Sequence, residues 1–271
     1  MSRRMLLALL AASAAAQPPG LSRSQQAYER ANTLFEQRKL PESLAALEEA
    51  LRADPNNVPA LTLKAKIAIS ANRLDIAGES LERAVAADPS SWYAHFLYGF
   101  WHYLRDDWAH AISELTTARK LNPKDTRSPL YLAMTHERLG DTARALAFYE
   151  EALRLEEAAG APDPYTLLGY SRVLQSLGRL DDCTKILNRA IKLYPNSRAA
   201  QYELGRLLLK RGDPKGAAKA GEAALRLPAD EDVTQVQIHY LLVRAYTAAG
   251  DDQLAAKHAA ALRAVETPVL P

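Results

Sequence analysis

The chain has 271 residues, of which 48% are hydrophobic and 24% are charged, with 12 glycines and 15 prolines. These fractions are typical of a folded protein and exclude the collagen-like and disordered classes. The single cysteine excludes an internal disulfide and a cysteine-rich zinc site. The formal net charge of +2 gives little support to nucleic-acid binding through a basic surface.

The first sixteen residues have the layout of a secretory signal peptide. Arg3 and Arg4 form a positive head, residues 5–10 are apolar, and residues 14–16 are three alanines before Gln17. The apolar stretch is shorter than the roughly 20 residues of a membrane-spanning helix, so we expect no stable span after cleavage. Loss of the two arginines on cleavage takes 34 basic residues to 32, against 32 acidic ones, so the mature chain is formally neutral. Nucleic-acid binding through a basic surface thereby loses its main support. The pattern predicts export, and both Sec and twin-arginine routes stay open.

The remainder of the chain repeats with a period of 34 residues. Similar segments such as ALRADP, AVAADP and ARKLNP recur, and successive leading alanines are separated by 34, 34, 34, 38 and 34 residues. These alanines are Ala50, Ala84, Ala118, Ala152, Ala190 and Ala224. Such a period predicts a chain built from stacked supersecondary units.

Two further positions follow the same period. A small residue precedes each leading alanine by seven positions: Ser43, Ala77, Ala111, Ala145, Cys183 and Ala217. A turn is predicted five residues earlier again, at Arg38, Asn72, Asp106, Gly140, Gly178 and Gly212. A last unit fits around Gly250 and Ala255. Each unit is therefore predicted to form helix, short turn and helix, and several end at a proline that stops the second helix.

The segments LGDTARALAFYEEALRL (139–155) and LGRLDDCTKILNRAIKLYPN (177–196) closely resemble the tetratricopeptide repeat motif. The resemblance implies an all-α fold, an α-α superhelix of about seven repeats over residues 24–267, after a signal peptide (1–16) and a short linker (17–23) and before a tail (268–271). Small residues would lie where the two helices of a unit cross, and Leu47, Leu81, Leu115, Tyr149 and Leu187 would fill the space between them. Two insertions, at 157–164 and 229–237, are interpreted either as functional loops or as simple variation in loop length.

We find no catalytic constellation in the sequence. The segment from Gly169 to Val173 lacks the closing glycine of a nucleophile elbow, and His136-Glu137 lacks the second histidine of a zinc-protease helix. We expect His95, His102 and His136 to be packed or surface histidines and Cys183 to be a small buried residue. The sequence thus predicts a protein that is not an enzyme and has no metal and no cofactor.

In proteins resembling this one, the first helix of each repeat lines a concave groove. Registering the repeats places a set of aromatic, apolar and basic side chains on that face. The predicted partner-binding groove consists of Tyr93, Phe96, Phe100, Tyr103, Arg127, Met134, Arg138, Tyr165, Arg172, Tyr202, Arg206, Tyr240 and Arg244.

Two features of this set suggest binding. Residues 92–108 contain eight of the nineteen aromatic residues, too many for all of them to face the core. A tyrosine one turn before an arginine recurs in repeats six and seven, with a looser version in repeat five. Tyrosine and arginine are enriched at interface hot spots, and arginine can bind a carboxylate bidentately. The alternative is that these tyrosines and arginines only stack on each other as surface packing.

The sequence therefore predicts an exported, periplasmic or secreted scaffold or adaptor of a bacterial cell envelope, which binds a peptide or protein partner in its groove. The alternative is a binding protein or sensor for a small acidic ligand held by the Tyr/Arg pairs. Nucleic acid is not an expected partner. Self-association through the last repeat stays open, because no separate capping helix follows it.

Overall fold

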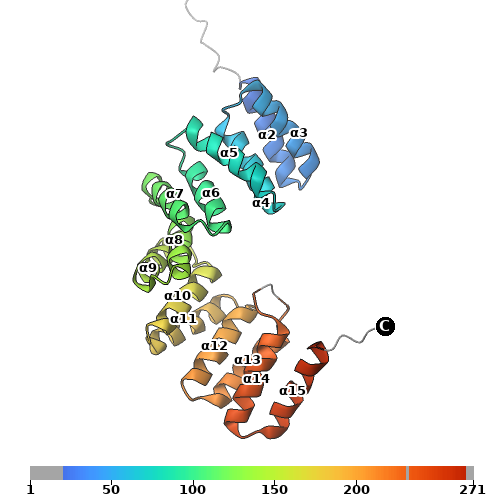
Figure 1. Ribbon diagram of the computed structural model, residues 1–271, viewed down its shortest axis with the longest axis vertical. Coiled ribbons are helices and arrows are strands. Elements are labelled where there is room, and N and C mark those ends of the chain that lie inside the picture. The colour runs from blue at the N-terminus through green and yellow to red at the C-terminus, as the bar shows by residue number, and fades with distance from the viewer. Residues whose placement is uncertain (1–20, 230–231, 267–271) are drawn as a thin grey trace, which may run out of the picture. The chain divides into compact units, whose positions relative to one another are not determined.

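A computed structural model describes residues 21–229 and 232–266. The predicted signal peptide (1–16), residues 17–20 of the linker, residues 230–231 of the second insertion and the tail (268–271) lie outside the described residues. The described part is all-α, with fourteen helices; Figure 1 labels the helices in chain order. The chain divides into two compact units, the first ending at Leu121 and the second beginning at Asn122.

Unit 1 contains three helical hairpins. Each first helix packs against the second helix that follows it, and consecutive hairpins also contact each other. The helices of unit 1 are α2 (Arg23–Glu36), α3 (Leu40–Ala53), α4 (Val58–Ser70), α5 (Leu74–Ala87), α6 (Trp92–Leu104) and α7 (Trp108–Leu121).

Unit 2 contains four hairpins with the same pairwise packing. Its helices are α8 (Arg127–Arg138), α9 (Thr142–Ala159), α10 (Pro164–Ser176), α11 (Leu180–Leu193), α12 (Arg198–Lys210), α13 (Pro214–Arg226), α14 (Gln235–Ala249) and α15 (Asp252–Glu266). In the part of the chain that is described, none of these helices combines the length and the apolar character needed to cross a bilayer.

The helices begin and end where the local chemistry requires. Most first helices start at a side chain that accepts a hydrogen bond from the backbone N–H groups of the first turn, among them Ser22, Asn57 and Ser91. Within every hairpin the turn between the helices contains a residue with positive φ, and its position repeats along the chain. These residues are Arg38, Asn72, Asp106, Gly140, Gly178, Gly212 and Gly250, which confirms the predicted turn positions.

The residues at the helix crossings are buried as predicted. The small set from Ser43 to Ala217 is at most 1% exposed, and so are the larger residues Leu47, Leu81, Leu115, Tyr149 and Leu187. Ser43 Oγ donates to the Ala31 carbonyl oxygen at 2.8 Å, and Cys183 Sγ lies 3.2 Å from the Ser171 carbonyl oxygen. Burial raises the pKa of the Cys183 thiol to about 11. A buried leucine of this kind contributes about 1.5–3 kcal/mol to folding, so the crossings stabilise the hairpins.

A buried charged side chain forms hydrogen bonds with described residues at or beside each predicted insertion. In the first, α9 continues to Ala159, and the Glu156 carboxylate accepts from the Asp163 backbone N–H at 2.9 Å and from the Thr166 hydroxyl at 2.7 Å. In the second, the Arg198 guanidinium donates to the carbonyl oxygens of Leu227 and Val233 at 2.7 and 3.3 Å. Glu156 and Arg198 are 5% and 3% exposed. Asp163 in the first loop and Val233 in the second are therefore held to neighbouring helices by hydrogen bonds.

Candidate binding surface on the first helices

Within each unit, the first helices of successive hairpins contact one another. In unit 2, α8 contacts α10, α10 contacts α12, and α12 contacts α14. In unit 1, α2 contacts α4 and α4 contacts α6. Side chains from adjacent repeats can therefore converge on the face that the first helices share, which is where the sequence places the candidate groove residues.

In unit 2 this convergence produces a basic pocket of about 320 Å³. Its cationic side chains are Arg206 and Lys210 from α12 and Arg244 from α14, so the structure brings two of the predicted arginines together. Sequence reasoning missed Lys210, although it lies one turn after Arg206 on the same face of α12. The residues that line the basic pocket are Gln175, Arg206, Leu209, Lys210, Leu241 and Arg244.

The three cations of the basic pocket differ in how far their charges are already neutralised. Arg206 forms hydrogen bonds of 3.0 Å with both carboxylate oxygens of Glu203, and its guanidinium lies 5.8 Å from the Tyr202 ring centroid. Lys210 Nζ lies 3.5 Å from the Gln175 carbonyl oxygen. Among the described residues, Arg244 has no hydrogen-bond or ion-pair partner. The pocket therefore retains cationic charge that a bound anion could neutralise.

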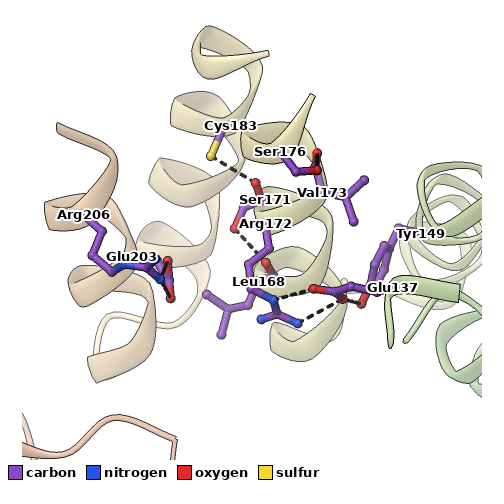
Figure 2. Close-up of polar contacts among 10 residues, drawn as sticks. All are labelled: Glu137, Tyr149, Leu168, Ser171, Arg172, Val173, Ser176, Cys183, Glu203 and Arg206. Atoms are coloured by element: carbon purple, nitrogen blue, oxygen red, sulfur yellow. Dashed lines mark hydrogen bonds and ion pairs between the residues drawn. The ribbon is translucent and has the colours of Figure 1, made fainter. Parts of the chain in front are cut away.

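Arg172, the arginine of repeat five in the predicted Tyr/Arg series, forms an ion pair between two hairpins. Figure 2 shows its guanidinium directed at Glu137 of α8, with Nε–Oε1 and Nη2–Oε2 distances of 2.8 and 3.3 Å. The same carboxylate accepts a hydrogen bond of 2.6 Å from the buried Tyr149 hydroxyl. Burial alone would lower the pKa of Arg172, but the hydrogen bond and charge of Glu137 raise it. Arg172 thus joins two adjacent hairpins.

The tyrosines of the series also differ from one another. Tyr165 and Tyr240 are 57% and 51% exposed. Tyr202 is half-buried against the core of unit 2, and its burial raises the pKa of its phenol although Arg206 opposes this. Of the predicted pairs, Tyr202 and Arg206 therefore lie against each other, as the packing alternative expects, and Arg206 also lines the basic pocket.

The remaining predicted residues of unit 2 lie on α8. Arg127 pairs with Asp125, with an Nε–Oδ1 distance of 2.9 Å. Met134 is partly buried against the core, and Arg138 is exposed at the end of the helix. None of these three residues lines the basic pocket described above.

The aromatic side chains of α6 in unit 1 lie on different faces of the helix. Tyr93, Phe96 and Phe100 form a stacked row with centroid separations of 6.2 and 6.5 Å, in which Phe96 is 5% exposed and the other two are half-buried. Tyr103 packs edge-on against Trp108 at 5.6 Å.

Trp101 packs in another direction, against α5. Its Nε1–H donates to the Leu74 carbonyl oxygen at 2.6 Å. A Cβ at Gly78 would lie 2.4 Å from the Trp101 ring, so only glycine leaves room for this contact. The aromatic residues are therefore divided between the core and a partly exposed row, and the need for a glycine opposite the indole was not visible in the sequence.

Comparison with known proteins identifies the repeat. A family model described as tetratricopeptide repeat matches residues 28–91, 62–100, 101–164 and 171–232, which together span more than half of the chain. The chain belongs to the tetratricopeptide repeat family. No curated protein sequence matches this tetratricopeptide repeat chain significantly.

Several solved structures share the fold of this tetratricopeptide repeat chain. The Pseudomonas aeruginosa protein pilF matches with a TM-score of 0.67 and 18% identity over 75% of this chain and 91% of its own. A tetratricopeptide repeat protein of Parabacteroides merdae matches with a TM-score of 0.65 and 16% identity, covering 91% and 94% of the two chains.

A third match, YrrB, is described as a tetratricopeptide repeat protein with an unusual peptide-binding site. Its TM-score is 0.58, with 17% identity over 74% of this chain and 98% of its own. At identities this low, the three matches show that the folds are alike and nothing more about the present chain. Tetratricopeptide repeat proteins in general are non-enzymatic scaffolds for protein–protein interaction, and fold membership alone does not identify a partner.

Proposed function

We propose that this protein is a scaffold or adaptor that binds an acidic segment of a protein partner on the first helices of unit 2. The observation that carries the proposal is the basic pocket, in which Arg244 forms no hydrogen bond or ion pair with the described residues while Arg206 and Lys210 add further positive charge. None of the described residues that line this pocket carries a carboxylate, and Glu203, on the same helix as Arg206, already pairs with it.

The chemistry of the basic pocket suits a carboxylate. Guanidinium groups bind carboxylates through paired N–H donors, and such charge-assisted hydrogen bonds are about twice as strong as neutral ones. Leu209 and Leu241 supply apolar surface beside the cations. The exposed Tyr240, one turn before Arg244, adds a rigid aromatic contact of the kind found at interface hot spots.

The size of the basic pocket supports a second candidate, a small acidic ligand such as a saccharide acid. Small-molecule sites typically occupy about 300–1,000 Å³, and the basic pocket of about 320 Å³ lies at the lower end of that range. We favour a protein partner, because a small pocket with three cations fits the end of one acidic side chain better than a whole ligand.

The cellular setting is part of the proposal. The signal-peptide pattern of residues 1–16 supports export, and we place the protein in the periplasm or outside the cell, as an adaptor of the envelope.

The test is affinity capture from an envelope extract with the mature chain as bait. The test variant carries Arg206→Ala and Arg244→Ala, which remove two charges from the basic pocket. Arg172 is left intact because its loss would leave Glu137 without its cation. We expect the wild-type bait to retain a partner, and the double variant to lose at least about 90% of it, since losing a charged contact at a hot spot costs about 2 kcal/mol or more.

The matched control is Arg154→Ala with Lys192→Ala. These residues are exposed on the second helices α9 and α11, so the control removes the same charge from another face. Equal capture by the wild type and the double variant would contradict the proposal. Thermal stabilisation by a saccharide acid, abolished in the double variant and accompanied by no captured protein, would instead favour the small-ligand alternative.

A further inference from the structure

Three potential metal ligands converge at the turn between α6 and α7. The ligand atoms of His102, Asp107 and His110 all lie within 4.8 Å of one another. Asp107 Oδ2 is 3.0 Å from His102 Nδ1 and 2.8 Å from His110 Nδ1. The His102 side chain is 9% exposed, Asp107 38% and His110 69%, so the cluster has a buried side and an open side.

The equivalent turn in the next repeat differs at one of these three positions. His136 and Asp141 correspond to His102 and Asp107, with a nitrogen–oxygen distance of 3.7 Å. Arg144 stands where His110 would be, and its Nε lies 3.4 Å from Asp141 Oδ2. A histidine paired with the aspartate that begins the second helix is therefore common to both turns. The third donor is specific to the α6–α7 turn.

We infer that the α6–α7 turn binds a divalent transition-metal ion, with His102, Asp107 and His110 as its protein ligands. Two imidazoles and one carboxylate match the donor preference of Zn²⁺, which binds nitrogen and oxygen at about 2.0–2.2 Å in a tetrahedron. On binding, metal–ligand bonds take the place of the hydrogen bonds between the imidazole nitrogens and the carboxylate, and each neutral imidazole keeps its one proton on the ring nitrogen that does not bind the metal. Small side-chain shifts suffice, because the donor atoms are already in contact.

The open side of the cluster determines what the metal can do. Three protein ligands leave the fourth tetrahedral position for water or for a donor from another molecule. The metal would also join the end of α6 to the start of α7, so binding stabilises the folded state of this hairpin. In the α8–α9 turn the guanidinium of Arg144 repels a metal ion and offers no lone pair.

The test is titration of the full mature chain, without a histidine tag, at pH 7.5. Zn²⁺ binding is measured by calorimetry and Co²⁺ binding by visible absorption. We expect one ion per chain, with the intense visible bands of tetrahedral Co²⁺. The variant His110→Arg copies the α8–α9 turn and should bind the metal at least about tenfold more weakly. Loss of a hydrogen-bond partner of a metal ligand already lowers metal affinity about 10–100-fold, and loss of the ligand itself should lower it at least as much.

A second variant, Asp107→Asn, removes the carboxylate ligand of the α6–α7 turn. Its matched control is Asp141→Asn, the same change at the equivalent position of the α8–α9 turn. We expect Asp107→Asn to weaken binding and Asp141→Asn to leave it unchanged, with the helical circular dichroism of both variants preserved. Equal affinity of the wild type and His110→Arg overturns the proposal, as does an absence of binding by the wild type at millimolar Zn²⁺.

Discussion

At the residue scale, the turns within the hairpins show where backbone conformation determines residue choice. All seven need a residue with positive φ, a region in which a Cβ costs about 1–2 kcal/mol. Glycine fills the four turns of unit 2, whereas Arg38, Asn72 and Asp106 fill those of unit 1. Asn and Asp tolerate this conformation through local hydrogen bonds, but arginine has no such compensation. The turn at Arg38 is therefore the most strained of the seven.

This difference predicts opposite effects for two substitutions. Gly178 has φ +73°, and a Cβ there meets no atom within 4 Å, so Gly178→Ala should destabilise through backbone strain alone, by about 1 kcal/mol. Arg38→Gly removes the same strain from an exposed side chain, and should stabilise by up to about 1 kcal/mol once glycine's extra freedom in the unfolded chain is included. Urea denaturation followed by circular dichroism measures both. Arg38→Gly as destabilising as Gly178→Ala would contradict the argument.

The position of the ion-pair partner separates two of the predicted binding arginines. Arg172 and Arg206 have similar places in the repeat pattern. However, Arg172 reaches Glu137 in the preceding hairpin, whereas Arg206 pairs with Glu203 on its own helix and still lines the basic pocket. An acidic residue three positions earlier is visible in the sequence, but a partner 35 residues away is not.

At the scale of elements, buried histidines should make helix packing sensitive to pH. His136 is 4% exposed, and burial lowers its pKa although Asp141 opposes this. Burial and the neighbouring His258 lower the pKa of His239, and the Nδ1 atoms of these two rings are 3.0 Å apart. A pKa lowered on folding means that the unfolded chain binds more protons as the pH falls below about 6.5. The contribution of these histidines to the free energy of unfolding is therefore fully present above that pH and is lost as the pH falls below it.

We therefore expect the free energy of unfolding to be lower at pH 5.8 than at pH 7.5, as measured by urea denaturation across this range. His136→Gln should make the dependence shallower, whatever its effect on stability at pH 7.5. Glu156, whose pKa burial raises, acts in the opposite direction. A pH profile with the same slope in the wild type and the variant would contradict the assignment to His136.

The second insertion offers a test of how a loop is held to its hairpins. Arg198→Ala removes the donors to the Leu227 and Val233 carbonyl oxygens and should destabilise unit 2 by about 2–3 kcal/mol. Amide hydrogen exchange at the end of α13 and the start of α14 should accelerate. The control Arg226→Ala changes an exposed arginine of α13 and should alter stability by no more than about 0.5 kcal/mol. An effect of Arg198→Ala as small as that of the control would show that the loop needs no such support.

At the scale of the whole molecule, the two units share the same pairwise packing of helices but differ in their hydrophobic cores. Unit 1 has separate cores between its hairpins, including one around Leu47 and another around Leu61. Unit 2 has a larger core that extends from Leu130 to Leu242, and it also carries the basic pocket. Repeat proteins gain stability mainly from interfaces between neighbouring repeats, so these cores hold each unit together.

Export is a prediction about the whole chain. Expression in a bacterium with a periplasm should give a mature protein that begins at Gln17, because residues 14–16 form the small-residue cleavage pattern. Intact-mass measurement of the periplasmic fraction tests this, and the variant Arg3→Glu with Arg4→Glu should retain the full-length chain in the cytoplasm. Full-length protein in the wild-type cytoplasm, with none in the periplasm, would contradict export.

The sequence by itself determined the repeat, its turns and the buried crossing residues. These depend on local geometry: a 34-residue period leaves room for two helices and their turns, and a crossing admits only small side chains. The tertiary structure decided which side chains are available for binding. The basic pocket is formed by residues of α10, α12 and α14. Arg172 pairs with a carboxylate from another hairpin. The cluster of His102, Asp107 and His110 forms where α6 and α7 meet. Such contacts depend on side-chain directions and distances between elements, which a linear spacing does not specify.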